Sequence, residues 1–152
     1  MRDPKSIDRL QGLHPKVRVP FQAFIEECEN TLDITLRISQ GLRTIAEQDA
    51  LYAKGRSTAG PVVTNAKGGS SFHNYGLAID LVEMVNGDTE VNWKYDMVNL
   101  RATAQKHGFE WGGSWIHLKD YPHFEMNFGY SWQQLFEKHT NGDVDENGYV
   151  NI

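Results

Sequence analysis

Segments with helical spacing of apolar residues and segments with strand-like alternation follow one another here without the regular strand–helix–strand order of a parallel sheet. Apolar residues recur at helical spacing over residues 20–32, and they alternate with polar residues over residues 33–39. The strands that this pattern predicts are short, and their connections suit antiparallel pairing. We therefore expect an α+β fold, in which helices pack on a small antiparallel sheet.

The first of these helices is expected to begin near Pro20, because proline suits the first turn of a helix. Cys28 falls on its apolar side. This position favours a buried thiol that packs as a small apolar group over a nucleophile. Because the chain has 1 cysteine, an internal disulfide is excluded.

Three later segments carry the start and stop signals of helices. Capping boxes at Thr44–Glu47 and Ser131–Gln134 predict helices that run to about Lys54 and about His139. A longer helix is expected to end at Gly108. Its predicted inner face consists of Trp93, Met97, Leu100 and Ala104.

Short strands and turns are expected between these helices. The predicted strands are residues 33–39, 76–82, 109–111 and 123–126. A loop rich in Gly, Ser and Asn over residues 60–71 leads into the second strand. Asn-Gly pairs predict turns at residues 86–87, 141–142 and 147–148, so the tail is expected to end in a hairpin.

Composition limits the functional classes. The 152 residues are 39% hydrophobic and 23% charged, which fits one globular domain over residues 1–152. A net charge of −5 gives no electrostatic reason to expect nucleic-acid binding. No apolar run is long enough for a membrane span, and residues 1–10 lack the apolar centre of a signal peptide. We expect a monomer with neither nucleic-acid binding nor membrane insertion.

One candidate metal-binding segment runs from His73 to Asp80. His73 lies where the Gly-rich loop meets a strand. On that strand Asp80 shares a face with Ala78 and Val82, where a carboxylate is costly unless it is paired or bound to a metal. Zinc takes about four ligands from His, Cys and carboxylate side chains, and a catalytic site leaves one position open. A spacing of this kind also occurs in structural or solvated pairs.

A second segment surrounds His123. This histidine enters a strand flanked by aromatic residues, and Asp120 stands three residues earlier. Pro122 stiffens the chain between them. His123 is thus a candidate ligand, and Asp120 a candidate base that faces a metal-bound water. An acidic turn before a strand is the alternative.

Other histidines and acids leave further alternatives open. His117 is a rival third ligand. Glu125 is a rival base, although its alternation with His123 equally favours a supporting role behind a metal ligand. Residues 143–148 copy the first half of a calcium loop but lack its bidentate glutamate, so we predict a turn there. Structural roles are expected for His14, His107 and His139.

Taken together, two motifs carry a resemblance to a known family. Ser71-x-His73-x-x-Gly76-x-Ala78-x-Asp80, followed by Asp120-x-x-His123, resembles the zinc peptidases of the D-Ala-D-Ala carboxypeptidase and vancomycin-resistance dipeptidase group. Within that group, the L-alanyl-D-glutamate endopeptidases of phage endolysins and bacterial autolysins are the most similar. Their further matches are residues 40–44, residues 47–52, Gly55-Arg56 and Trp111-Gly112-Gly113-x-Trp115. The resemblance covers roughly Ile34 to Phe128.

The resemblance implies a role for each matched residue. His73, Asp80 and His123 would bind Zn²⁺. Asp120 would act as the general base, and Arg43 would bind the substrate carbonyl and the oxyanion formed from it. Ser71, Trp115 and Gln48 are the expected substrate-binding residues, and Ser71 is not expected to be a nucleophile.

The function implied is hydrolysis of the L-Ala–D-Glu bond in peptidoglycan stem peptides. A D-Ala-D-Ala carboxypeptidase or dipeptidase is the alternative. A non-catalytic zinc module, like the related Hedgehog signalling domain, would not need both Arg43 and Asp120. Without a signal peptide, the protein is expected to reach the wall either as a phage endolysin released through a holin or by an unknown export route.

Overall fold

A small antiparallel sheet forms the centre of the computed structural model, which describes residues 1–94 and 97–152 and all of their side chains except those of residues 97 and 98. The strands are β1 (Thr35–Gln40), β2 (Ala78–Val85), β3 (Glu90–Asn92), β4 (Glu110–Trp111) and β5 (His123–Glu125). Their order is β1-β2-β5-β4, and β3 pairs with β2. The expected α+β class is confirmed.

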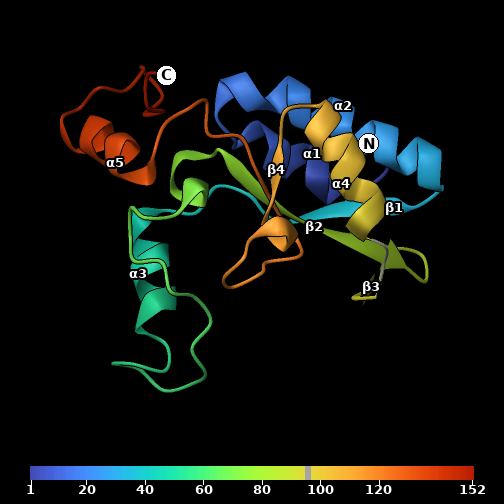
Figure 1. Ribbon diagram of the computed structural model, residues 1–152, viewed down its shortest axis with the longest axis horizontal. Helices are drawn as coiled ribbons and strands as arrows, with labels where there is room; N and C mark the ends of the chain where they lie inside the picture. The colour runs from blue at the N-terminus through green and yellow to red at the C-terminus, as the bar shows by residue number, and fades with distance from the viewer. Residues whose placement is uncertain (95–96) are drawn as a thin grey trace.

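Helices α1, α2 and α4 gather beside the sheet, whereas α3 and the loop after it project away from this helical layer (Figure 1). The helices are α1 (Pro4–Gln11), α2 (Pro15–Leu32), α3 (Ile45–Ala53), α4 (Met97–Lys106) and α5 (Trp132–Thr140), with 3-10 turns η1 (Phe72–Tyr75) and η2 (Gly112–Ser114). The described part of the chain contains no helix with the length and apolar character that a membrane span requires.

Phenylalanine rings join the helical layer to the sheet. Phe21 of α2 stacks on Phe109 with ring centroids 4.0 Å apart, and Phe24 lies 5.1 Å from Phe124 of β5. Alternation along β5 therefore directs Phe124 into the core and leaves its two neighbours on the opposite face of the sheet. That second face carries the candidate site.

The expectation that the helix over residues 20–32 begins near Pro20 is wrong. Helix α2 begins five residues earlier at Pro15, which occupies the first turn, and His14 is its N-cap. Pro20 therefore lies inside the helix, where it cannot donate a backbone hydrogen bond. Burial of Val17 on the additional turn contributes apolar contacts that favour the longer helix. Cys28 is buried as expected, and burial raises the pKa of its thiol to about 12.

The inner face predicted for α4 is correct only in part. Leu100 and Ala104 are buried, and Gly108 follows the helix with a φ of 84°. Trp93, however, is 73% exposed, because it lies in the turn after β3 and precedes the first residue of α4. The side chain of Met97 lies outside the described residues.

The C-terminal tail makes a smaller hairpin than expected. Its pairing is a single antiparallel bridge between Val144 and Val150. One carboxylate oxygen of Asp145 accepts hydrogen bonds from the backbone N–H groups of Asn147 and Tyr149, as in a side-chain-stabilised turn. The expected turn is thus confirmed. Val150 also accepts a hydrogen bond from His14 at 2.9 Å, which ties the tail to the start of α2.

Candidate metal centre

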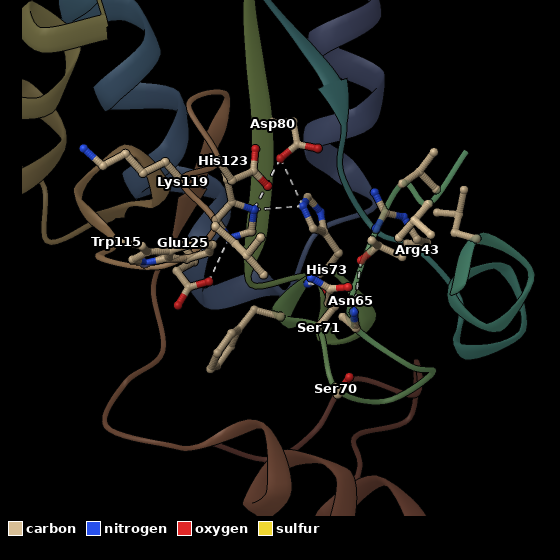
Figure 2. Close-up of a pocket in the computed structure, with 18 residues that line it drawn as sticks. Arg43, Asn65, Ser70, Ser71, His73, Asp80, Trp115, Lys119, His123 and Glu125 are labelled. Carbon is tan, nitrogen blue, oxygen red and sulfur yellow. Dashed lines mark hydrogen bonds and ion pairs between the residues drawn. The ribbon is translucent and has the colours of Figure 1, made fainter. Parts of the chain in front are cut away.

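Three side chains from η1, β2 and β5 converge on one point (Figure 2). His73 Nε2 lies 3.2 Å from Asp80 Oδ1 and 3.2 Å from His123 Nδ1, and the last two atoms are 3.3 Å apart. Ligand atoms around a tetrahedral zinc, with bonds of about 2.0–2.1 Å, are about 3.3 Å from one another. The size and the donor set of this cluster fit zinc.

Register in the sheet brings two of these groups together. Asp80 of β2 is directly paired with His123 of β5. The chain reaches β2 through η1, where the Ser71 hydroxyl accepts the N–H of His73 at 3.3 Å. Gly76 then adopts the left-handed region with a φ of 68°, which turns the chain into the strand. Local capping and strand pairing thus place the three candidate ligand atoms.

The second nitrogen of each histidine faces an acceptor. His73 Nδ1 lies 2.8 Å from the carbonyl oxygen of Gly41, and His123 Nε2 lies 2.7 Å from Glu125 Oε2. A carbonyl or an ionised carboxylate can only accept a hydrogen bond. These two outer nitrogens therefore serve as donors, and Nε2 of His73 and Nδ1 of His123 are the atoms that would face a cation at the cluster.

Charges in the cluster reinforce one another. Burial alone would raise the pKa of Asp80, but hydrogen bonds with His123 and His73 hold it well below its usual value. Burial alone would lower the pKa of His123, but hydrogen bonds with Asp80 and Glu125 raise it to about 9. A cation at this cluster therefore competes with a proton on His123.

The cluster opens onto a cleft of about 860 Å³, which Arg43, Ser71, Trp115 and Asp120 also line. The ring centroid of Trp115 lies 5.1 Å from that of His123. The side chain of Asp120 opens onto the cleft, yet partial desolvation, followed by the negative charge of Asp80, raises its pKa.

Arg43 is attached to the cluster through its backbone and through Gln48. Its N–H donates to the carbonyl oxygen of His73 at 3.0 Å, and its Nη1 donates to Gln48 Oε1 at 2.9 Å. Its Nε is buried and has no hydrogen-bond partner among the described residues. An arginine held in this way keeps donors for a ligand in the cleft.

Asp120 depends on a close backbone approach. Its N–H donates to the carbonyl oxygen of Gly112 at 3.2 Å, and its carbonyl oxygen accepts the N–H of His123 at 3.3 Å. A Cβ on Gly112 would lie 2.5 Å from that carbonyl oxygen. Gly112, which follows Trp111, thus lets η2 pack directly against Asp120.

Three residues from the motifs and alternatives considered above, Gln48, Trp111 and His117, do not line the cleft. Gln48 is 0% exposed and lies behind Arg43, so it does not line the cleft as a substrate-binding residue would. Trp111 is buried in the core and donates from Nε1 to the carbonyl oxygen of Tyr121 at 2.7 Å. His117 is exposed on the loop before β5 and does not line the cleft. The carbonyl of Gly41 was not anticipated, because a backbone acceptor leaves no signal in the sequence.

Comparisons with known proteins agree with this geometry. The D-alanyl-D-alanine carboxypeptidase family matches residues 64–126. The peptidoglycan L-alanyl-D-glutamate endopeptidase CwlK of Bacillus subtilis is 42% identical in an alignment 123 residues long, which covers 75% of this chain and 73% of CwlK.

Two solved structures are similar in fold. The L-Ala D-Glu endopeptidase ChiX of Serratia marcescens has a TM-score of 0.58 and 30% identity, with 82% of this chain and 88% of ChiX covered. A Zn(II) complex of a mutant of the vancomycin resistance D,D-pentapeptidase VanY has a TM-score of 0.56 and 14% identity. The match covers 82% of this chain and 78% of the VanY chain. The chain belongs to the D-alanyl-D-alanine carboxypeptidase family of zinc peptidases, and within it to the branch of the peptidoglycan L-alanyl-D-glutamate endopeptidases.

Proposed function

We propose that this protein is a zinc-dependent endopeptidase that hydrolyses the bond between L-alanine and D-glutamate in peptidoglycan stem peptides. The observation that carries the proposal is the 42% identity with CwlK over 73% of that enzyme. The structural match to ChiX supports the same bond. The alternative, a terminal D-Ala-D-Ala bond, rests on the description of the family that matches residues 64–126, whereas the likeness to VanY at 14% identity concerns the fold alone.

Zinc is assigned to His73 Nε2, Asp80 Oδ1 and His123 Nδ1. The mutual distances of 3.2, 3.2 and 3.3 Å and the protonated outer nitrogens support this assignment. When bound, zinc supplies a Lewis acid that makes water nucleophilic near neutral pH and polarises the scissile carbonyl. Two histidines and one carboxylate leave a coordination position for these partners.

Asp120 is assigned as the general base. It opens onto the cleft beside the cluster, and its raised pKa improves its ability to take a proton from the attacking water. It then gives the proton to the leaving amine of D-glutamate. Glu125 is less suited to this role, since it is buried and already receives the hydrogen bond from His123 Nε2.

Arg43 is assigned to the substrate carbonyl, whose oxygen becomes negative as water attacks. A fixed donor of this kind is worth about 3 kcal/mol in comparable sites. Gln48 and the His73 carbonyl hold Arg43 in place. Ser71 and Trp115 line the same cleft and are assigned to substrate binding.

Digestion of purified peptidoglycan, with and without a chelator, tests the proposed bond. Mass spectrometry of the fragments should identify new D-glutamate amino termini, and the chelator should abolish them. Release of D-alanine in place of these termini would show that the alternative bond is cleaved.

Substitution of the proposed base tests the mechanism. Asp120→Asn should lower kcat by roughly 10²- to 10⁴-fold, because the amide cannot accept the proton. Bound zinc, measured by elemental analysis, should stay unchanged, since Asp120 is not an assigned ligand. Asp8→Asn, on the exposed side of α1, is the matched control and should behave as wild type. Activity that survives Asp120→Asn would show that Asp120 is not the general base.

A further inference from the structure

Glu125 is a buried carboxylate on the face of the sheet that carries the metal cluster. Glu125 is 6% exposed, and His123 is 5% exposed. The alternation of β5 places both side chains on the same face, while Phe124 between them enters the core. A buried carboxylate destabilises the folded state unless it is hydrogen bonded, so Glu125 requires a hydrogen-bond donor.

That partner is the imidazole ring of His123. Glu125 Oε2 lies 2.7 Å from His123 Nε2, on the far side of the ring from the metal-facing Nδ1. The cross-strand neighbour of Glu125 on β2 is Ala78, whose single methyl group leaves room for the carboxylate. Figure 2 shows Glu125 and His123 joined in this way at the wall of the cleft.

The contact decides which nitrogen of His123 faces the cluster. A neutral imidazole exists in two tautomers, with the proton on Nδ1 or on Nε2, and a rotation of roughly 180° about the Cβ–Cγ bond would put the carbon Cδ2 in the place of Nδ1. Trp115 packs on this ring but supplies no acceptor that could distinguish the nitrogens. The Glu125 carboxylate does distinguish them, because it accepts only from a protonated Nε2.

We propose that Glu125 is a positioning residue that fixes the tautomer and the ring orientation of His123, so that Nδ1 is presented to zinc. This inference rests on the proposed zinc site and adds a residue to it. The site is asymmetric as a result: a backbone carbonyl orients His73, whereas a side chain, which a substitution can remove, orients His123.

The test compares two variants of nearly equal size. Glu125→Gln keeps an oxygen that can accept from Nε2, whereas Glu125→Met keeps the volume and lacks that oxygen. Zinc affinity, measured by competition with a chelator, should fall roughly 10- to 100-fold in Glu125→Met. Glu125→Gln should recover most of this loss. Glu110→Gln is the control, because Glu110 lies opposite Glu125 on β4 and is exposed.

A spectroscopic measurement makes the test independent of activity, and its first part, on the wild type, does not depend on how the variants fold. In the zinc-loaded wild type, ¹⁵N NMR should show a protonated Nε2 and a metal-bound Nδ1 on His123. The visible spectrum of the cobalt-substituted protein should change in Glu125→Met and not in Glu125→Gln. A wild type that binds zinc through Nε2, or a Glu125→Met variant with unchanged affinity and spectrum, would overturn the proposal. A wild type that binds no zinc would overturn the proposed function itself.

Discussion

The guanidinium of Arg43 depends on a residue that never meets the cleft. Gln48 accepts from Arg43 Nη1 at 2.9 Å and donates from its own Nε2 to the carbonyl oxygen of Ala66 at 2.8 Å. One buried amide thus connects α3, Arg43 and the long loop that lines the cleft. Gln48 is suited to this because an amide both donates and accepts.

Gln48→Leu should therefore misplace Arg43 without emptying the zinc site. We expect kcat/KM to fall roughly 10- to 100-fold, since small displacements of a catalytic donor have effects of this size. Steady-state kinetics on a stem peptide would measure the loss, and zinc content should stay at the wild-type level. Gln22→Leu, on the exposed side of α2, is the matched control. Equal activity in both variants would contradict the role of Gln48.

The junction between η1 and β2 depends on a glycine with two separate constraints. Gly76 has a φ of 68°, and a Cβ there would lie 2.7 Å from the backbone nitrogen of His14. Gly87, in the turn after β2, has a φ of 67° and nothing within 4 Å of such a Cβ. The two positions share the same left-handed conformation, which is strained for alanine, but differ in available space.

Gly76→Ala should destabilise the protein more than Gly87→Ala. A left-handed alanine costs roughly 1–2 kcal/mol at either position. The clash with His14 should add about 1–3 kcal/mol at Gly76 only. Urea unfolding of both variants would measure the difference. Equal losses would mean that the backbone relaxes around residue 76 and that the close approach is not limiting.

Helix α1 is anchored to β1 by a partly buried ion pair between Asp3 and Arg37. Asp3 is the N-cap of α1, and its Oδ2 accepts a hydrogen bond from the backbone N–H of Ser6. Its Oδ1 accepts a hydrogen bond from Arg37 Nη2 at 2.7 Å. Burial raises the pKa of Asp3, but hydrogen bonds from Arg37 and Ser6 outweigh it and lower the pKa below its usual value near 3.8. A lowered folded-state pKa stabilises the protein above the unfolded pKa, and this contribution is lost as pH falls through the folded one.

Asp3→Asn keeps the cap and removes the charge. We expect a loss of about 1–3 kcal/mol in the free energy of unfolding at neutral pH. The difference from wild type should shrink as the pH falls below about 4, where the unfolded chain takes up a proton on Asp3, and it should vanish once the pH has fallen through the lower folded-state pKa. Urea unfolding between pH 7 and 3 would follow it. Asp33→Asn, which removes an exposed pair with Arg2, should change stability little at any pH.

Across the whole molecule, zinc would join segments that are distant in sequence. The assigned ligands come from η1, β2 and β5, and none of these elements holds more than one of them. A ligand that binds only the folded chain stabilises it by mass action. Because the pKa of His123 is raised to about 9, a bound cation displaces a proton at neutral pH.

Addition of zinc at about 100 times its Kd should stabilise the protein by about 2.7 kcal/mol and raise Tm by roughly 5–10 °C at pH 7.5. The shift should shrink towards pH 5.5, since protonated histidines do not bind metal. Calorimetry with zinc and with a chelator would measure both effects. His73→Ala should show no shift. A shift of equal size in that variant would place the bound zinc elsewhere.

Local patterns were sufficient for much of the fold. The capping boxes at Thr44 and Ser131 mark the starts of α3 and α5, because their side chains bond to the backbone within the same turn. Alternation around Asp80 and His123 indicated their strands and the faces that they occupy. The motifs also indicated the candidate ligands, since imidazole and carboxylate groups that can bind a metal are recognised by residue type and spacing.

Long-range packing decided the rest. The start of α2, the exposure of Trp93 and the position of Gln48 behind Arg43 depend on contacts with segments far away in the chain. The same holds for the nitrogen that each histidine presents, which a carbonyl at Gly41 and a carboxylate at Glu125 determine. Sequence by itself indicated the candidate ligands, the candidate base and the candidate arginine, because side-chain type is local information. Only the tertiary structure decided which atoms meet, because sheet register and burial are properties of the folded chain.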